Sequence, residues 1–320
     1  MRILVRATNW LGDAIMCLPA LHALRSANPS AHIAILGLPW IADLYSSESF
    51  CDEVIVYPKE SWSAKLVLAK TLRGRFDKAL LLQNSFEAAA FTFLARIPER
   101  AGFNRDGRRL LLTHPVDVPV IGHERFYYLE LLRLAGWIDG YNADSPIRLN
   151  GIERHPEPVI GISPGAAFGS AKRWYPERFA EAAADVALAR GSRVALFGSP
   201  AEADIVAIVE AGLKARGVQV ENYASRTTLR EFIQLVANCE LMLTNDSGAM
   251  HVAYAVGTPS VTIFGSTDHI GTGPVGPLAR IVREPVHCSP CKLRECPIDH
   301  RCMTRISPER VALEALDLLK

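Results

Sequence analysis

A single acidic residue follows the first apolar run of the sequence, at a point where its carboxylate could face a bound ligand. The segment VRATNWLGDAIM (residues 5–16) places Gly12 and Asp13 directly before a second apolar run. In an open sheet of parallel strands, the loop after a strand lies at the carboxyl edge, where ligands bind. Gly12 would let a ligand approach the backbone, and Asp13 would project into the site. The alternative is that Asp13 caps a helix, which is a common role of aspartate.

This loop does not carry the fingerprint of a dinucleotide site. That fingerprint needs three glycines in the pattern GxGxxG, and this loop has a single glycine. The free N–H groups at the start of the next helix still favour an anionic ligand. The pattern therefore predicts a ligand site after the first strand, but not a dinucleotide loop.

A second candidate site lies in the small-residue loop SPGAAFGSAKRWYP, residues 163–176. Small residues let phosphate oxygens reach backbone N–H groups, and Lys172 would add a full positive charge. Pro176 suits the first position of a helix. The alternative is a flexible loop that carries a solvated basic pair.

The most specific segment is TNDSGAMHVAYAVGTPSV, residues 244–261, in which Asp246 follows an apolar run. Three residues open the next helix: Ser247, Gly248 and Ala249. The positive end of the helix dipole and the free N–H groups there would stabilise a pyrophosphate leaving group. Asp246 would accept hydrogen bonds from sugar hydroxyls, or would cap the helix. His251 would lie within about the first turn, where a histidine is more often a structural residue than a catalyst.

Apolar runs that alternate with helical patterns must position these residues. The runs lie at 2–6, 32–37, 53–57, 78–83, 159–165, 193–199, 240–248 and 260–266. Near-continuous apolar runs are typical of buried parallel strands. Helical patterns lie at 14–27, 62–73, 85–95, 176–189, 201–214 and 228–238.

The segment LNGIERHPEPV (residues 149–159) interrupts this alternation with glycine, two prolines and charges, which is typical of a linker. The predicted fold class is therefore α/β, with two Rossmann-like doubly wound domains facing across a cleft. The predicted domains are residues 1–153 and residues 154–320.

Composition restricts the class of protein. The chain has 320 residues, of which 49% are hydrophobic and 22% charged, as in a soluble globular protein with room for two domains. A net charge of +1 gives no overall attraction to nucleic acid. Arg2 and Arg6 interrupt the first apolar run, and no apolar stretch approaches the length that spans a bilayer. We therefore expect a cytoplasmic location.

Four segments together resemble the bacterial lipopolysaccharide heptosyltransferases of glycosyltransferase family 9. They are RATNWLGDAIMCLPAL, KRWYP, NDSGAMHVAYAVGTPSVTIFGSTD and CSPCKLRECPIDHRCM. The resemblance spans nearly the whole chain and implies the GT-B fold, with the acceptor bound by the amino-terminal domain and ADP-heptose by the carboxyl-terminal domain. The implied reaction moves L-glycero-D-manno-heptose from ADP-heptose to the first heptose of the inner core (heptosyl-Kdo-lipid A), with inversion and without a required cofactor or metal. Three alternatives remain open: another family 9 transferase, a GT-B sugar-nucleotide epimerase and a non-catalytic nucleotide-binding module.

The resemblance also implies a role for each candidate residue. Asp13 would be the general base, and Lys172 would neutralise the departing diphosphate. The amides around Ser247, Gly248 and Ala249 would bind that diphosphate, while Asp246 would hold the heptose hydroxyls. Glu202 is a candidate for the ribose by its place in the family pattern, with a solvated position at a helix start as the alternative.

A run of basic residues could bind the anionic acceptor. The five arginines are Arg96, Arg100, Arg105, Arg108 and Arg109, and only Glu99 and Asp106 lie among them. We expect Arg105, Arg108 and Arg109, with Gly12, to contact the acceptor. The run would also draw the enzyme to the anionic inner leaflet as a peripheral protein, without insertion. The alternative is an ordinary solvated face.

The last motif is a cluster of cysteines near the end of the chain. The residues are Cys288, Cys291, Cys296 and Cys302. The first pair has the spacing of metal ligands, and His287 and His300 lie nearby, but the later spacings are irregular for a zinc ribbon. A structural zinc site, reduced thiols that pack a loop, and disulfides all remain open.

Overall fold

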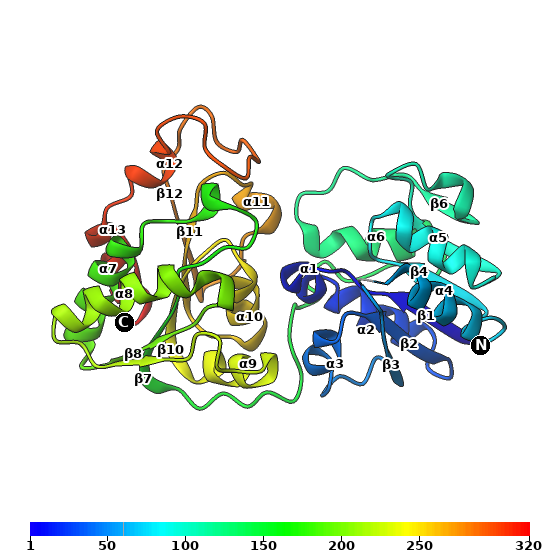
Figure 1. Cartoon of the computed structure of the whole chain (residues 1–320), viewed down its shortest axis with the longest axis horizontal. Coiled ribbons are helices and arrows are strands. Elements are labelled where there is room, and N and C mark those ends of the chain that lie inside the picture. The colour runs from blue at the N-terminus through cyan, green and yellow to red at the C-terminus, as the bar shows by residue number, and fades with distance from the viewer. Residues whose placement is uncertain (60) are drawn as a thin grey trace. The chain divides into compact units, whose positions relative to one another are not determined.

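The computed structural model describes residues 1–59 and 61–320 of the chain. It divides into two compact units, Met1–Gly151 and Ile152–Lys320, and each is a six-stranded parallel sheet with flanking helices (Figure 1). The predicted α/β class with two doubly wound domains is confirmed. The division falls two residues before the predicted boundary, and residues 152–156 carry no regular structure. The assignment of acceptor and donor to the two units stays a prediction.

Unit 1 (Met1–Gly151) has the strand order β3-β2-β1-β4-β5-β6. Its strands are β1 (Arg2–Arg6), β2 (His32–Gly37), β3 (Glu53–Val56), β4 (Lys78–Leu81), β5 (Glu99–Phe103) and β6 (His114–Val116). Its α-helices are α1 (Leu11–Met16), α2 (Leu18–Ala27), α3 (Trp40–Leu44), α4 (Trp62–Thr71), α5 (Phe86–Leu94) and α6 (Tyr127–Leu134). Two short 3₁₀ turns are η1 (Arg109–Leu111) and η2 (Glu124–Phe126).

The single helix predicted over residues 14–27 is two helices. Cys17 separates α1 from α2, and Pro19 lies at the start of α2. Proline has no N–H to donate to the carbonyl four residues earlier, so the first helix ends and a second begins. The apolar pattern runs through the break, because both helices bury apolar side chains.

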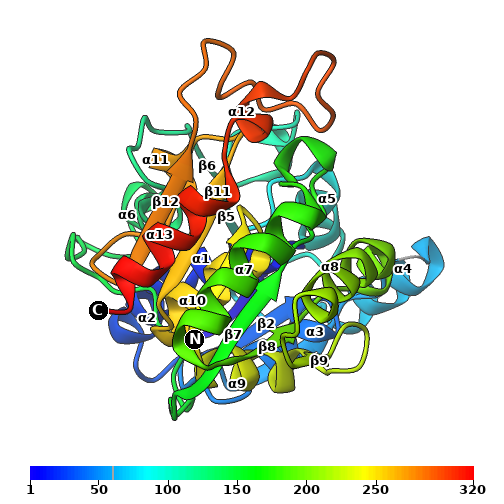
Figure 2. The ribbon, with the colours of Figure 1, turned by 90° about the vertical axis from the view of Figure 1, so that its left-hand side faces the viewer.

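Unit 2 (Ile152–Lys320) has the strand order β12-β11-β10-β7-β8-β9. Its strands are β7 (Glu157–Ser163), β8 (Arg193–Leu196), β9 (Val220–Asn222), β10 (Cys239–Asn245), β11 (Ser260–Phe264) and β12 (Ala279–Arg283). Its helical segments are η3 (Ser170–Lys172), α7 (Pro176–Arg190), η4 (Pro200–Glu202), α8 (Ala203–Ala215), α9 (Leu229–Asn238), α10 (Gly248–Val256), α11 (His269–Thr272), α12 (Arg301–Thr304) and α13 (Pro308–Leu318). Figure 2 shows α7, α8 and α13 together on one face of this sheet, where α7 contacts both other helices.

Both sheets reverse their strand order at one place, the topological switch point. In unit 1 the reversal lies between β1 and β4, and in unit 2 it lies between β7 and β10. The loops that leave two such strands diverge, so their ends leave a crevice at the carboxyl edge that can accept a ligand. Asp13 follows β1, Lys172 follows β7 and Asp246 follows β10. All three predicted residues therefore follow a strand that borders a switch point.

A buried arginine holds the carboxyl edge of the unit 1 sheet together. The Arg108 side chain has no solvent exposure, and it donates to the Phe103 carbonyl (2.8 Å), to Asn84 Oδ1 (2.8 Å) and to the Gln83 carbonyl. Burial lowers the pKa of Arg108 to about 10, so the guanidinium is still charged at neutral pH. One side chain thus ties the loop after β4 to the end of β5.

Replacement of Arg108 by methionine should destabilise unit 1, because three buried acceptors would lose their donor. We expect a loss of about 3 kcal/mol in the free energy of unfolding, measured by urea denaturation. Arg109→Ser is the matched control, since Arg109 is exposed, and it should change stability by less than about 0.5 kcal/mol. Equal effects of the two substitutions would contradict this role of Arg108.

Candidate active site

An ion pair joins the two predicted charged residues of unit 2. Lys172 Nζ lies 2.6 Å from Asp246 Oδ2, and the two side chains are 15% and 3% exposed. Thr267, from the loop after β11, donates a hydrogen bond to the same carboxylate oxygen. The residues are 74 positions apart in the chain, and the switch point between β7 and β10 brings them together. The predicted cation and the predicted sugar-binding carboxylate therefore belong to one site.

Asn245, which the sequence reasoning did not single out, anchors the loop that carries Lys172. Its amide nitrogen donates to the Pro164 carbonyl (2.7 Å), and its oxygen accepts from the Trp174 N–H (3.0 Å). Asn245 is fully buried at the last position of β10. Its place between an apolar run and Asp246 is the signal that could have identified it. The amide fixes both ends of residues 164–174 to the neighbouring strand.

The start of α10 presents backbone N–H groups beside this ion pair. Ser247 is the N-cap residue, but its side chain makes no capping bond, and the first turn of α10 contains no acidic residue. The Ser247 hydroxyl instead lies 3.1 Å from Thr244 Oγ1. Ala249 and His251 are buried in the first turns. An uncapped helix start without a carboxylate of its own suits an incoming anion.

Glu202 lies against the same loop from the side of β8. Its carboxylate accepts from the backbone and the hydroxyl of Ser199, both at 2.8 Å, in a capping box. A Cβ atom at position 165 would overlap the Glu202 carboxylate, so Gly165 permits this approach. Glu202 thus has a structural role at a helix start and also borders the predicted donor site. Its contact with a ribose stays a prediction.

Residues 288–302, which contain the four clustered cysteines, contact the loops that follow β7 and β11. The Ala171 N–H donates to the Arg294 carbonyl (2.9 Å), and the Ser289 hydroxyl donates to the Gly265 carbonyl (2.6 Å). His300 Nε2 lies 3.1 Å from the Ala171 carbonyl. Arg294 and Lys172 both lie over the Phe168 ring, at 5.5 and 5.0 Å from its centre. Arg294 is therefore a second cation next to the predicted diphosphate site that the sequence reasoning missed.

The four cysteines of this segment line one small cavity of about 20 Å³. All seven cysteines of the chain are free thiols in the structure, and burial together with the neighbouring thiols raises the pKa of Cys302 to about 11. Within residues 1–59 and 61–320, no group of three or more histidine, cysteine or acidic side chains is arranged to hold a metal ion. The zinc alternative stays an untested prediction.

In unit 1, Asp13 lies in the first turn of α1 and is half-buried. The N-cap residue of α1 is Trp10, so the capping position belongs to a different residue. Burial, and then the neighbouring Cys17, Asp13 and Glu124, raise the pKa of Tyr128. Asp13 and Glu124 therefore lie near the same buried tyrosine. Gly12 precedes Asp13 and is also half-buried.

Polar residues at the unit 1 switch point were not identified from the sequence. Arg6, at the end of β1, is 2% exposed, donates to Asn9 Oδ1 (3.0 Å) and lies 4.2 Å from the centre of the Tyr57 ring. The Asn9 N–H donates to Gln83 Oε1 (3.1 Å), which joins the loops after β1 and β4. Burial lowers the pKa of Arg6 to about 10. This network fixes the loop that leads to Asp13.

The predicted acceptor arginines do not lie in one kind of environment. Arg105 and Arg109 are exposed, and a hydrogen bond with Tyr127 raises the pKa of Arg105. Arg108 is inside the unit, where the three hydrogen bonds described above occupy its guanidinium. This placement corrects the expectation that Arg108 is part of a surface patch. Arg105 and Arg109 remain candidates.

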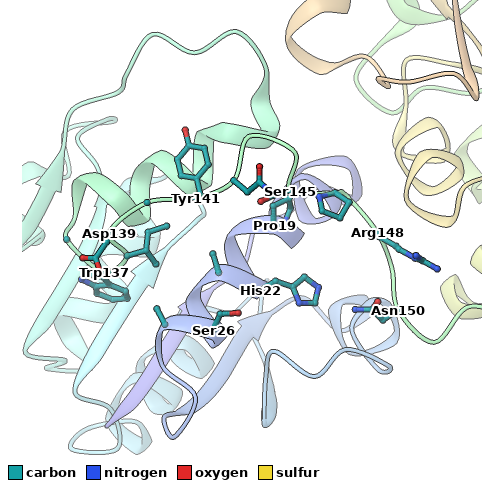
Figure 3. A pocket seen from close by; sticks show the side chains of 16 residues that line it. Pro19, His22, Ser26, Trp137, Asp139, Tyr141, Ser145, Arg148 and Asn150 are labelled. Carbon is teal, nitrogen blue, oxygen red and sulfur yellow. The ribbon is translucent and has the colours of Figure 1, made fainter.

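A pocket of about 770 Å³ lies on a different part of unit 1, between α2 and the loop after α6 (Figure 3). His22 and Ser26 of α2 line it, whereas Asp13 lies on α1, before the break at Cys17. Buried Glu48 accepts from Asn150 and from His22 beside it. Burial alone would raise the pKa of Glu48, but these hydrogen bonds keep it below its usual value. The volume could hold a ligand, yet the pocket does not contain Asp13.

Residues 66–301, well over half of the chain, match the sequence model of Glycosyltransferase family 9 (heptosyltransferase). The chain belongs to glycosyltransferase family 9. Lipooligosaccharide heptosyltransferase 2 of Haemophilus influenzae is 30% identical to this family 9 chain, and the match covers 100% of the chain and 99% of the relative.

Solved structures agree with this assignment. The structure of ADP-heptose lipopolysaccharide heptosyltransferase II of Escherichia coli matches with a TM-score of 0.82 and 29% identity, over 100% of this chain and 98% of that one. The E. coli heptosyltransferase WaaC, solved with ADP-2-deoxy-2-fluoro heptose, matches with a TM-score of 0.78 and 18% identity, over 98% of each chain. The predicted GT-B fold, the glycosyltransferase class and the resemblance to the family 9 heptosyltransferases are confirmed.

No helix among the described residues of this family 9 glycosyltransferase combines the length and the hydropathy that a membrane span needs.

The ion pair of this family 9 enzyme should be strongly coupled. Lys172→Met leaves a buried carboxylate without its cation and should cost roughly 3 kcal/mol of stability, and Asp246→Asn should cost a similar amount. The double variant should lose about 1–3 kcal/mol less stability than the sum of the two single losses, because both charges are removed together. Urea denaturation of all four proteins gives the coupling energy. Strictly additive losses would mean that the two charges do not stabilise each other.

Proposed function

We propose that this chain is a lipopolysaccharide heptosyltransferase that transfers L-glycero-D-manno-heptose from ADP-heptose to the first heptose of heptosyl-Kdo-lipid A. Membership of family 9 and the full-length similarity to proteins named heptosyltransferase 2 support this reaction. The observation that carries the proposal is the pair of switch points. One is followed by a carboxylate, Asp13, and the other by a cation, Lys172, next to an uncapped helix start.

Unit 1 would supply the base. Asp13 accepts the proton of the attacking acceptor hydroxyl as that oxygen forms a bond to the anomeric carbon of the donor. The bond from this carbon to the ADP oxygen breaks in the same displacement, so the configuration at the carbon is inverted. The proton ends on the Asp13 carboxylate, and the electron pair of the broken bond ends on ADP.

Unit 2 would stabilise the leaving group. Negative charge grows on the diphosphate as the bond breaks, and Lys172 with the first amides of α10 would lie against that charge. Asp246 would accept hydrogen bonds from heptose hydroxyls through the oxygen that Lys172 does not contact. Donor binding would redirect Lys172 from Asp246 toward phosphate. These groups perform the charge stabilisation, so the proposed reaction uses no cofactor.

The acceptor is lipid-borne and anionic, so we propose a peripheral location at the inner face of the cytoplasmic membrane. Arg105 and Arg109 would contact carboxylate or phosphate groups of the acceptor. The alternative within the family is a heptosyltransferase that adds a different heptose of the inner core. Incubation with ADP-heptose and a series of truncated cores distinguishes them: the proposal expects a product one heptose heavier only from the acceptor that already carries one heptose.

Asp13→Asn should lower turnover by about 100-fold or more while ADP affinity stays nearly unchanged, because the base acts on the acceptor proton alone. The measurement is the initial rate of heptose transfer, with calorimetry for ADP. Asp43→Asn, an exposed carboxylate on α3, is the control and should keep full activity. Turnover of the Asp13 variant within a few-fold of the unmodified enzyme would exclude Asp13 as the base.

Lys172→Ala should weaken ADP binding and also lower turnover, because a charge directed at the diphosphate acts on the ground state and on the transition state. Lys214→Ala, an exposed lysine on α8, should change neither quantity. Calorimetric titration with ADP measures the binding. If the Lys172 variant binds ADP as tightly as the unmodified protein, the lysine belongs to the structure of the loop rather than to the donor site.

A further inference from the structure

Large apolar side chains lie on the outer surfaces of α4 and α5, where a helix that covers a sheet usually carries polar residues. On α4, Trp62, Leu66 and Val67 are 62%, 44% and 60% exposed, while Lys65 of the same helix is only 6% exposed. Lys65 points inward, where its Nζ lies 3.2 Å from Glu87 and 4.6 Å from the centre of the Trp62 ring. The helix thus buries Lys65, one of its two lysines, and exposes three large apolar side chains.

Helix α5 continues this surface. Phe86, Phe93 and Leu94 are 53%, 49% and 39% exposed, and their spacing of seven and eight residues places them on one stripe of the helix. The only charged side chain of α5, Glu87, is occupied by Tyr57 and Lys65. The two helices contact each other (Figure 1). A helix that is apolar on both its inner and outer faces is normally covered on both sides.

The turn η1 adds the most exposed apolar side chain of this surface. Leu110 is 91% exposed, and η1 contacts α5. Arg100 joins the two elements, because its Nε donates to the Leu111 carbonyl (2.7 Å) and its guanidinium lies 5.5 Å from the centre of the Phe93 ring. We call the following residues the α4–α5 face: Trp62, Leu66, Val67, Phe86, Phe93, Leu94 and Leu110.

Basic residues border this face. Lys70 and Arg73 follow Leu66 at the exposed end of α4, and Arg73 donates to the Leu94 carbonyl (3.2 Å). Arg96 is exposed two residues after Leu94, and Arg109 is exposed beside Leu110. Two carboxylates close to the face in sequence are engaged, since Glu87 pairs with Lys65 and Glu99 pairs with Lys78 at 2.9 Å. Asp106, three residues before Arg109, is exposed, so cations outnumber carboxylates along this border but do not exclude them. An apolar centre with a cationic border matches an anionic lipid surface, which offers acyl chains beneath negative headgroups.

We infer that the α4–α5 face inserts shallowly into an anionic lipid bilayer and holds unit 1 at the membrane. The aromatic and leucine side chains reach the boundary between headgroups and acyl chains, and the basic border contacts lipid phosphates. The inference differs from the sequence-based expectation, which was attraction to the membrane without insertion. The inference rests on the proposed function in one respect: an enzyme with a lipid-borne acceptor must act at a membrane.

Vesicle flotation of the full-length protein tests this inference. The unmodified protein should bind vesicles that contain phosphatidylglycerol, and should bind pure phosphatidylcholine vesicles at least about ten-fold more weakly. Leu66→Ser with Leu110→Ser should lower binding to the anionic vesicles by about ten-fold or more. The control pair, Leu188→Ser with Leu313→Ser, removes two leucines of unit 2 that are 61% and 67% exposed, and it should leave binding unchanged.

The salt dependence of vesicle binding distinguishes the contribution of the basic border from that of the apolar α4–α5 face. Binding of the unmodified protein should weaken at high salt but persist, because screening removes only the electrostatic part. The Lys70→Gln with Arg73→Gln variant should bind weakly at every salt concentration and lose its salt dependence in part. Binding of the leucine variant equal to that of the unmodified protein would overturn the inference. A dimer in sedimentation velocity that the leucine substitutions dissociate, without vesicle binding, would also overturn it and assign the face to a second copy of the chain.

A second assay, the rate of heptose transfer to a soluble, delipidated acceptor, distinguishes a failure of this inference from a failure of the proposed function. The leucine and Lys70/Arg73 variants should transfer heptose to that acceptor at the unmodified rate, because none of these residues belongs to the proposed site. If no transfer occurs with any protein while vesicle binding follows the pattern above, the proposed function fails and the membrane surface stands. If the Leu66→Ser and Leu110→Ser double variant is unstable, Leu110→Ser alone replaces it in the vesicle test, because the Leu110 side chain is 91% exposed.

Discussion

The buried ion pair between Lys172 and Asp246 is the interaction on which the arrangement of unit 2 depends. A carboxylate that is 3% exposed is stable only if charged and hydrogen-bonding partners compensate for the lost water. Those partners come from the loops after β7 and β11, so the requirement fixes both loops against the end of β10. Asn245 and the Arg294 carbonyl hold the same loop from two further sides. The site is thus ordered by the need to satisfy one buried charge.

The two units have the same strand order but carry different side chains at their switch points. Both sheets reverse between their first and fourth strands, and both place the predicted site residues at the carboxyl edge beside that reversal. In unit 2 the loops carry a cation and free amides, which suit a phosphate. In unit 1 the loop after β1 carries Asp13, and buried Arg6 fixes the preceding residues through Asn9 and Gln83. The same strand order therefore presents different side chains at the two switch points, because those side chains lie on the loops that follow the strands.

Most of the fold could be predicted from apolar runs, because buried parallel strands leave a strong signal. The central strands β1, β4, β7 and β10 were all identified in this way. The edge strands β6 (HPV) and β9 (VEN) were not, since they are short and half-exposed and their residues are polar or contain proline. Strand β5 (ERAGF) begins with two charged residues, which concealed its buried second half.

The candidate site could be predicted only in part. Asp13, Lys172 and Asp246 could be chosen because each follows an apolar run, but their partners depend on contacts between distant segments. Arg108 and Arg109 show the limit: the two are adjacent and identical in type, yet one is fully buried and the other exposed. The burial of Lys65 on α4 likewise depends on a distant residue, because its ion-pair partner is Glu87 of α5.

A crystal structure with bound ADP would test the central claim most directly, because it measures where the diphosphate lies relative to Lys172. The account predicts phosphate oxygens at about 3 Å from Lys172 Nζ and from the first amides of α10, with a lengthened distance between Lys172 and Asp246. A diphosphate bound elsewhere, with the 2.6 Å ion pair unchanged, would contradict it.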